Sequence, residues 1–128
     1  MNLKTIDDLN LVSSTHLVVQ KEREAMASVI RHFKEIQERR VYAKRGYSSL
    51  FEMIVKEFKY SNSAASRRMR AVQVFKEVPE IEAKVIEGSL NLTQIAKAQT
   101  FFNQESKATN KTFKLEEKVE ILKSLENI

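Results

Sequence analysis

Two apolar stripes with the period of an α-helix follow one another in residues 48–76, and they limit the possible fold more than any other feature of the chain. The first stripe has spacing i, i+3, i+4, i+7, and the second i, i+4, i+7, i+10. The stripes consist of Phe51, Ile54, Val55 and Phe58, then Ala65, Met69, Val72 and Phe75. Such spacing places each set on one face of a helix. We therefore expect two short helices with facing apolar sides, joined by a turn at "FKYS".

The rest of the chain offers little that would interrupt helices. Its 128 residues include only two glycines and one proline, a composition that favours helices over turn-rich β structure. The absence of cysteine excludes disulfides and thiolate metal sites. The longest apolar runs are only a few residues, too short for a membrane span. We predict an all-α, multi-helix single domain over residues 1–128, soluble and cytoplasmic.

The N-terminal third is predicted to be dominated by one long helix. The spacing of Thr5 and Asp8 indicates a capping box and a short first helix. Ser13 or Ser14 then begins a long helix that extends to about Ala43, with apolar residues at three-, four- and seven-residue intervals. At ~1.5 Å per residue this helix is roughly 40 Å long, more than a compact domain of this size needs. We expect it to bend, break or pack partly against a second copy.

The C-terminal half, residues 79–128, is predicted to form further helices around one polar loop. Gly88 closes a helix that follows Pro79, and another helix begins near Leu92. Residues 103–112, "NQESKATNKT", form a polar stretch of low hydrophobicity, and we expect a loop there. A last helix is predicted from about Leu115.

The outward side of the second short helix carries the candidate binding residues. Ser63, Ser66, Arg67 and Arg70 have spacing i, i+3, i+4, i+7 and share one stripe, and Asn62 lies in the first turn. A recognition helix presents its N-terminal residues to base edges in the major groove. Arginine forms two hydrogen bonds with guanine or a forked contact with phosphate. We predict a helix-turn-helix at about residues 48–76, in which these five residues face DNA bases.

Four neighbouring side chains are predicted to contact DNA phosphates, namely Lys56, Lys59, Ser61 and Arg68. Many such motifs have glycine at the turn, where this chain has Lys59. If that position is left-handed, lysine costs ~1 kcal/mol relative to glycine.

The positive charge of the chain is concentrated in this segment. Residues 44–76 contain eight basic and two acidic side chains, a net of +6, against +1 for residues 1–43 and −2 for residues 77–128. A local basic block attracts polyanions. Arginines at helical spacing also occur on faces that contact only solvent, so the spacing alone leaves both interpretations open.

No arrangement of residues indicates catalysis. His16 and His32 are sixteen residues apart, which is no metal-ligand spacing. Acidic pairs occur on predicted helix surfaces, where they serve solubility and i, i+4 pairing. We assign no catalytic residue, no metal ligand and no cofactor, and we expect a protein that is not an enzyme.

Several short motifs in residues 38–98 agree in order and spacing with a known pattern. That pattern runs Arg-x-Tyr, Gly-Tyr-Ser-Ser-Leu-Phe, Ser-x-x-Ala-Ala-x-Arg-Arg, Pro-Glu and Gly-x-Leu-x-Leu. The matching residues are Arg40 to Tyr42, Gly46 to Phe51, Ser61 to Arg68, Pro79 with Glu80, and Gly88 to Leu92. The segment resembles the helical N-terminal region attached to some bacterial HNH endonucleases. More weakly, it is similar to the helix-turn-helix region of ParB/KorB-type partition proteins.

The resemblance implies a helical module that engages double-stranded DNA, followed in such proteins by further helical sequence and a nuclease domain. The HNH motif itself is not found in this chain, so the nuclease function would belong to a separate chain. A single module makes few contacts, which favours a homodimer that reads two half-sites. The alternative is a protein-interaction adaptor or antitoxin-like inhibitor without direct DNA contact. The long N-terminal helix and the acidic C-terminal half favour this alternative.

Overall fold

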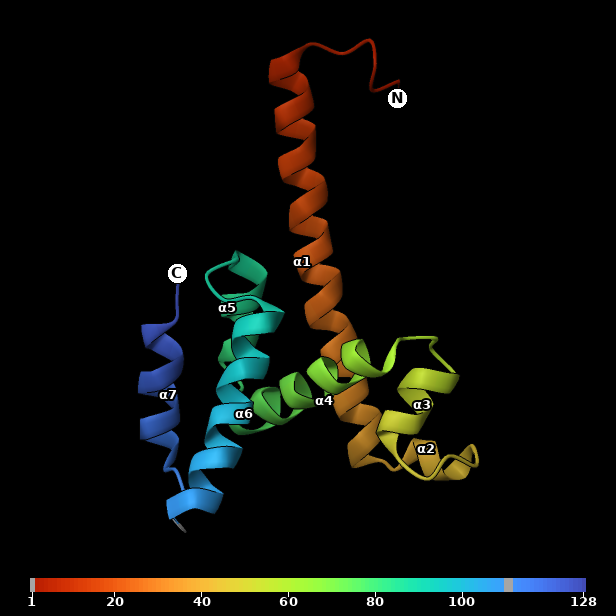
Figure 1. Cartoon of the computed structure of the whole chain (residues 1–128). Coiled ribbons are helices and arrows are strands. Elements are labelled where there is room, and N and C mark those ends of the chain that lie inside the picture. Colours follow the sequence, from red (N-terminus) through yellow and green to blue (C-terminus); the bar gives the residue numbers. More distant parts are fainter. Residues whose placement is uncertain (1, 110–111) are drawn as a thin grey trace.

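The structure, a computed structural model, describes residues 2–109 and 112–128. Within these residues it contains seven helices and no strand (Figure 1). The helices are α1 (Asp8–Glu38), α2 (Val41–Lys44), α3 (Leu50–Lys56), α4 (Asn62–Glu77), α5 (Ile81–Glu87), α6 (Leu92–Thr109) and α7 (Leu115–Ser124). The predicted all-α fold with a long N-terminal helix is confirmed. Over the described residues, no helix has the length and apolar character that a membrane crossing requires.

Helix α1 is one uninterrupted helix, so the predicted short first helix and the new start at Ser13 or Ser14 are wrong. Its cap is Asp7, whose side chain accepts a hydrogen bond from the backbone N–H of Asn10 at 2.8 Å. Serine inside a helix costs only a fraction of a kcal/mol, and neither glycine nor proline interrupts the segment. The helix also ends before Ala43, because Arg40 adopts a left-handed conformation with φ 54° and α2 begins after it.

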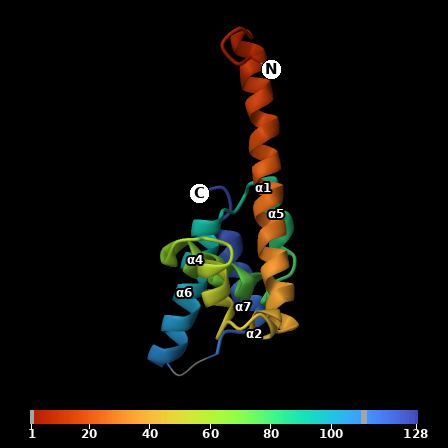
Figure 2. The ribbon, with the colours of Figure 1, turned by 90° about the vertical axis from the view of Figure 1, so that its right-hand side faces the viewer.

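The first half of α1 stands clear of the other helices (Figures 1 and 2). The buried residues of α1 are Ala27, Ile30 and Phe33, all in its second half. A helix of 31 residues is about 46 Å long at 1.5 Å per residue. As predicted, α1 is therefore longer than the domain can cover. Its first half has no neighbouring helix in the described part of the single chain.

Helix α4 is the central element of the core. It packs against α1 on one side and α6 on the other (Figure 1). Of its predicted apolar stripe, Ala65, Val72 and Phe75 are buried and Met69 is half-buried. The sequence pattern missed Ala71 and Val74, which are also buried. They are buried because α1 and α6 together cover more of the surface of α4 than the one predicted apolar stripe.

The apolar face of α3 differs from the predicted one. Ile54 is buried and Val55 packs on the core, but Phe51 and Phe58 remain 36% and 41% exposed. Leu50 and Met53, which the predicted stripe does not contain, are buried instead. Helix α3 has only seven residues, so Phe58 lies beyond its end in the following turn. There its ring packs beside that of Phe33, with centroids 5.5 Å apart.

The predicted polar loop at residues 103–112 is wrong for its described N-terminal part, because α6 continues to Thr109. Residues 110–111 lie outside the described residues. Asn91 caps α6, since its side chain accepts from the N–H of Gln94 at 2.9 Å while the Gln94 side chain accepts from the N–H of Asn91 at 3.0 Å. Buried Phe102 anchors the helix midway, and no glycine or proline stops it.

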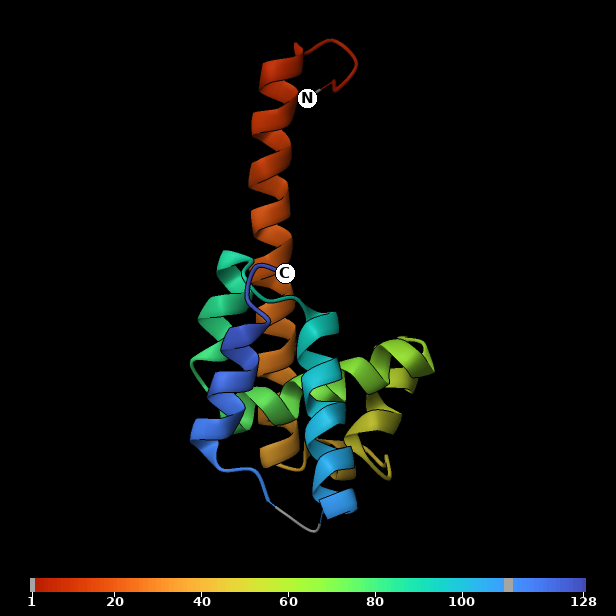
Figure 3. The same cartoon turned by 60° about the vertical axis from the view of Figure 1, so that its left-hand side comes forward.

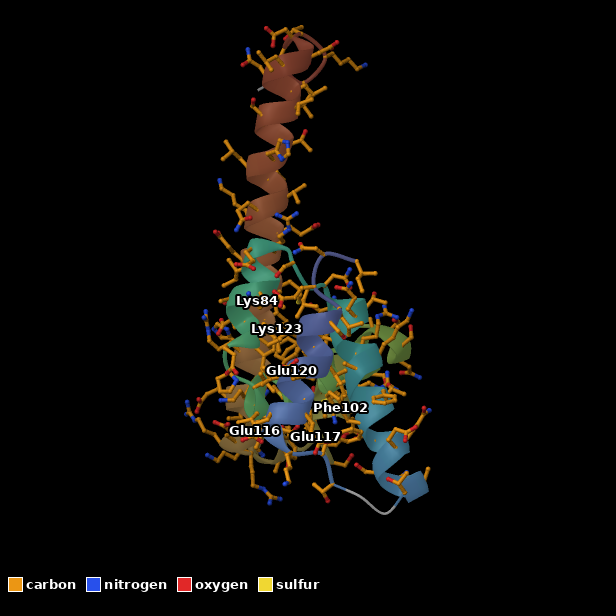
Figure 4. All side chains as sticks on the ribbon, turned by 90° about the vertical axis from the view of Figure 1, so that its left-hand side faces the viewer. Lys84, Phe102, Glu116, Glu117, Glu120 and Lys123 are labelled. Carbon is orange, nitrogen blue, oxygen red and sulfur yellow. The ribbon has the colours of Figure 1, made fainter. Side chains whose placement is uncertain are left out.

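Helix α7 completes the body beside α5 and α6 (Figure 3). Leu122 is its buried residue. Figure 4 looks onto α7 and labels Lys84 of α5 on one side of it and Phe102 of α6 on the other. Lys84 forms an ion pair with Glu126 at 3.0 Å, and Phe102 packs beside the ring of Phe113, with centroids 5.3 Å apart. Helix α7 and the α3–α4 turn lie on opposite sides of the molecule (Figures 1 and 3).

Candidate nucleic-acid interface

The turn between α3 and α4 spans residues 57–61 and contains a left-handed residue. Lys59 has φ 66°, in the region that favours glycine. The backbone N–H of the next residue, Tyr60, donates to the carbonyl of Ile54 at 3.3 Å, which closes the turn onto α3. Position 59 is thus left-handed, the case in which lysine costs ~1 kcal/mol relative to glycine.

Ser61 and the residues after it form the exposed start of α4. The Ser61 hydroxyl oxygen accepts from the backbone N–H of Ala64 at 3.1 Å, as predicted for an N-cap. The side chains of Asn62 and Ser63 are exposed. Figure 3 shows this end of α4, together with α3, projecting from the side of the body. The first turn of α4 is therefore accessible to a large partner.

Arg67 and Arg70 line one shallow groove of about 430 Å³ between α4 and α6. Both side chains are half-buried, as is Ser66 one residue earlier. No acidic side chain of residues 2–109 or 112–128 lies within ion-pair distance of either arginine. The two guanidinium groups are therefore held near the surface without a counter-charge.

Sequence reasoning missed the residues of α6 that share this groove. They are Thr93, Ala96, Lys97, Thr100, Phe101 and Gln104. Lys97 is exposed and places a third cation beside the two arginines. The polar residues of this set recur at intervals of four, three and four in the sequence, which is one face of a helix. That signal was available in the sequence, but nothing there indicated that this face lies against α4.

Arg68 lies on a different side of α4 and is not brought together with the other arginines. Its guanidinium carbon lies 4.4 Å from the centroid of the Tyr60 ring, and it donates to the carbonyl of Ala64 at 3.1 Å. It lines a second, larger cavity against α1 and the α5–α6 connection. This packing favours a structural role for Arg68 over the predicted phosphate contact.

The two lysines that are predicted to contact phosphates differ in whether an acidic side chain lies near them. Lys56 lies 3.7 Å from Glu52 one turn earlier on α3, an exposed and weak ion pair. Lys59 is exposed and has no acidic side chain within ion-pair distance among the described residues. Both lysines belong to α3 and its turn, at the same end of the molecule as the start of α4.

Glu57 fixes the segment before α3 to the turn that precedes α4. Its carboxylate accepts from Arg45 at 2.8 Å and from the Tyr47 hydroxyl at 3.2 Å. The hydrogen bond and charge of Arg45 lower the pKa of Glu57. The same contact raises the pKa of Arg45. Burial, followed by the bond to Glu57, raises the pKa of Tyr47. Arg45 is thus neutralised locally and adds little to the basic surface.

The two histidines stay apart in the structure and away from this groove. Both lie on α1 and are exposed, and the Nδ1 atom of His32 is 2.6 Å from the carbonyl oxygen of Ser28. Over the described residues, no group of three or more His, Asp or Glu side chains has a metal-binding arrangement. The groove offers hydrogen-bond donors and positive charge, which suit an anionic partner.

Comparison of the chain with protein-family models, with curated proteins and with solved structures finds no match.

Proposed function

We propose that this protein binds double-stranded DNA without catalysis, through the start of α4 and the adjoining face of α6. In this proposal α3 and α4 act as a helix-turn-helix with α4 as the recognition helix. The observation that carries the proposal is the pair Arg67 and Arg70, which line one groove and have no acidic side chain of the described residues within ion-pair distance. The resemblance of residues 38–98 supports the same class, either a regulator or a DNA-engaging module that acts with a separate nuclease chain.

The accessible part of α4 is the part that a recognition helix uses. Four of its five buried residues lie in the second half, from Ala71 onward, whereas Asn62 and Ser63 are exposed. A helix enters the major groove by its N-terminal residues, whose side chains reach base edges. Asn62, Ser63 and Ser66 are short hydrogen-bonding groups at this end, and Arg67 lies one turn after Ser63. They would face bases, with Arg70 reaching a base or a phosphate.

The lysine side chains around α4 have positions that suit contacts with the DNA phosphates. Lys59, Lys56 and the capped start of α4 at Ser61 are at one end of the helix, and Lys97 is on α6 beside its middle. Phosphate contacts fix the orientation of a protein on the duplex, while base contacts select the sequence. A segment with net charge +6 also gives salt-dependent attraction to DNA.

The experiment is fluorescence anisotropy of labelled duplex DNA titrated with the chain at several salt concentrations. Wild type is compared with Arg67→Ala/Arg70→Ala. The control is Lys4→Ala/Lys21→Ala, which removes the same charge from the N-terminal segment and the projecting half of α1, far from the groove. Each arginine contact with a base is worth about 1–3 kcal/mol, so the arginine variant binds at least about ten-fold more weakly. Equal affinity of the two double variants, or an affinity independent of salt, contradicts the proposal.

A second candidate function is protein interaction without DNA contact, which one observation favours. The projecting half of α1 leaves large apolar side chains exposed, such as Leu9 and Leu17. An adaptor or antitoxin-like inhibitor would use this surface. Copurification of a stable partner, together with no retardation of duplex DNA at low salt, would select this function over DNA binding.

A further inference from the structure

An exposed aromatic ring lines the groove that holds Arg67 and Arg70, where α4 and α6 cross (Figure 3). The ring belongs to Phe101, which is 42% exposed, whereas its neighbour in sequence, Phe102, is buried in the core. Successive residues of a helix point about 100° apart, so the two rings leave α6 on different sides. The proposed contacts with duplex DNA give Phe101 no role.

The Phe101 ring is held in place by two other rings but is not covered by them. Its centroid lies 6.1 Å from that of Phe102 and 5.8 Å from that of Phe113, with the ring planes inclined at 62° and 49°. These are the edge and tilted contacts that aromatic side chains prefer, and neither is a parallel stack that covers a whole ring face. Phe101 therefore keeps aromatic surface available to a molecule in the groove.

The rest of the groove is polar and positively charged. Arg67, Arg70 and Lys97 line it, and none of the lining residues in the described part of the chain is acidic. Thr93 and Gln104 are exposed and add hydrogen-bonding groups. A groove that combines cations with an aromatic ring suits single-stranded nucleic acid, because the cations contact phosphates while the ring stacks on a base.

A base inside a duplex cannot stack on this ring. The neighbouring base pairs cover both of its faces, and only its edges are accessible from the grooves of the DNA. An aromatic side chain therefore stacks on a base that is unpaired or rotated out of the duplex. Ser63 and Arg70 are seven residues, about 10 Å, apart along α4. At ~3.4 Å per nucleotide, a strand that leaves the duplex at the start of α4 reaches the groove within about three nucleotides.

We infer that the groove between α4 and α6 holds an unpaired nucleotide beside a bound duplex. Its base stacks on the ring of Phe101 and its phosphate contacts Arg70 and Lys97, which leaves Arg67 for the paired bases. The preferred substrate is then DNA in which a duplex meets a single strand, rather than a continuous duplex. This inference rests on the proposed binding of DNA through α4.

The test is fluorescence anisotropy of the full chain with a blunt duplex, with the same duplex carrying a single-stranded overhang of about three nucleotides, and with that overhang made of abasic sites. The overhang is placed at either end of the strand in turn. The abasic overhang has the same phosphates without bases, so it separates stacking from charge. Wild type is expected to bind the overhang at least about five-fold more tightly than the blunt duplex in one polarity or both, and the abasic overhang is expected to remove this preference.

The variants separate the ring from the fold. Phe101→Leu keeps an apolar side chain against the neighbouring rings but cannot stack, so it is expected to lose the preference for the overhang and to bind the blunt duplex within about two-fold of wild type. Phe101→Tyr keeps a ring and should keep the preference. Phe51→Ala is the matched control, because Phe51 is 36% exposed on α3 and does not line the groove. It should also keep the preference.

The possible failures are distinguishable. Equal affinity of wild type for the blunt duplex and for both overhangs overturns the inference and leaves the proposed binding of duplex DNA intact. A preference that survives Phe101→Leu, or one that the abasic overhang retains, likewise overturns the stacking on Phe101. Binding of neither DNA at low salt contradicts the proposed function itself, and this inference with it.

Discussion

At the scale of single residues, the left-handed conformation of Lys59 has a measurable cost. Glycine relieves the steric strain at φ 66° but increases the entropy of the unfolded chain. The net expectation for Lys59→Gly is a gain of about 0.5–1 kcal/mol in the free energy of unfolding over Lys59→Ala. Both variants lose the same charge, so their DNA affinities fall equally. Chemical denaturation measures the stability difference, and equal stabilities would show that the relief of strain does not exceed the entropy cost of glycine.

The three arginines of "RRMR" are predicted to separate by role. Arg68→Ala removes a half-buried guanidinium from the Tyr60 ring and lowers the free energy of unfolding by about 1 kcal/mol. Arg70→Ala changes it by less than about 0.5 kcal/mol, since it has no such partner. DNA affinity is expected to show the reverse order, with the larger loss for Arg70→Ala. Urea denaturation measures the stability of the two variants, and fluorescence anisotropy measures their DNA affinity. If the same variant shows the larger loss in both assays, the assignment is contradicted.

Glycine at position 88 is required by both conformation and space. Its φ is 89°, and an added Cβ would lie 2.8 Å from the Arg23 guanidinium carbon. Gly46 has φ 86° but open space around it. Gly46→Ala is therefore expected to cost about 1 kcal/mol from backbone strain alone, and Gly88→Ala to cost more because Arg23 must also move. Equal losses in thermal denaturation would mean that Arg23 is displaced without cost.

At the scale of elements, the link from Arg45 and Tyr47 to Glu57 predicts a pH dependence. The lowered pKa of Glu57 means that its ionised form is favoured in the folded state. Its stabilisation is fully present above the ordinary value of 4.5 and is lost as the pH falls through the lowered folded value. Glu57→Gln should therefore reduce the melting temperature more at pH 7 than at pH 3. An equal reduction at both pH values would indicate a packing defect.

Periodicity and capping residues were enough to predict the start of most elements. Helix α6 begins at Leu92 and α7 at Leu115, as the sequence indicates, and Gly88 ends α5 in the left-handed conformation of a helix cap. Helix ends were harder, because polarity alone does not stop a helix. Residues 103–109 are polar and helical, since they continue from buried Phe102 without a breaker.

The candidate site was only partly predictable from the sequence. The shared side of Ser63, Ser66 and Arg70 follows from helical spacing, which is a local property. The place of Lys97 beside Arg67, and of Arg68 on Tyr60, depends on how α4 packs against α6 and α1. Packing between distant segments leaves no comparable local pattern, so these contacts could not be deduced.

At the scale of the whole molecule, charge and shape are both asymmetric. The basic turn and start of α4 lie on one side of the body and α7, with three acidic and two basic side chains, lies on the other, while half of α1 extends beyond the body (Figures 1 and 3). Such a charge distribution orients the protein as it approaches a polyanion.

The measurement that tests the central claim most directly is a nuclear magnetic resonance titration of the isotope-labelled chain with duplex DNA at low salt. It locates the contact whatever the affinity. The largest amide shifts are expected at residues 59–70 and 93–97, with α7 nearly unaffected, and raising the salt concentration should reverse them. Shifts confined to α1 or α7, or no shifts at low salt, would contradict DNA binding through α4 and α6.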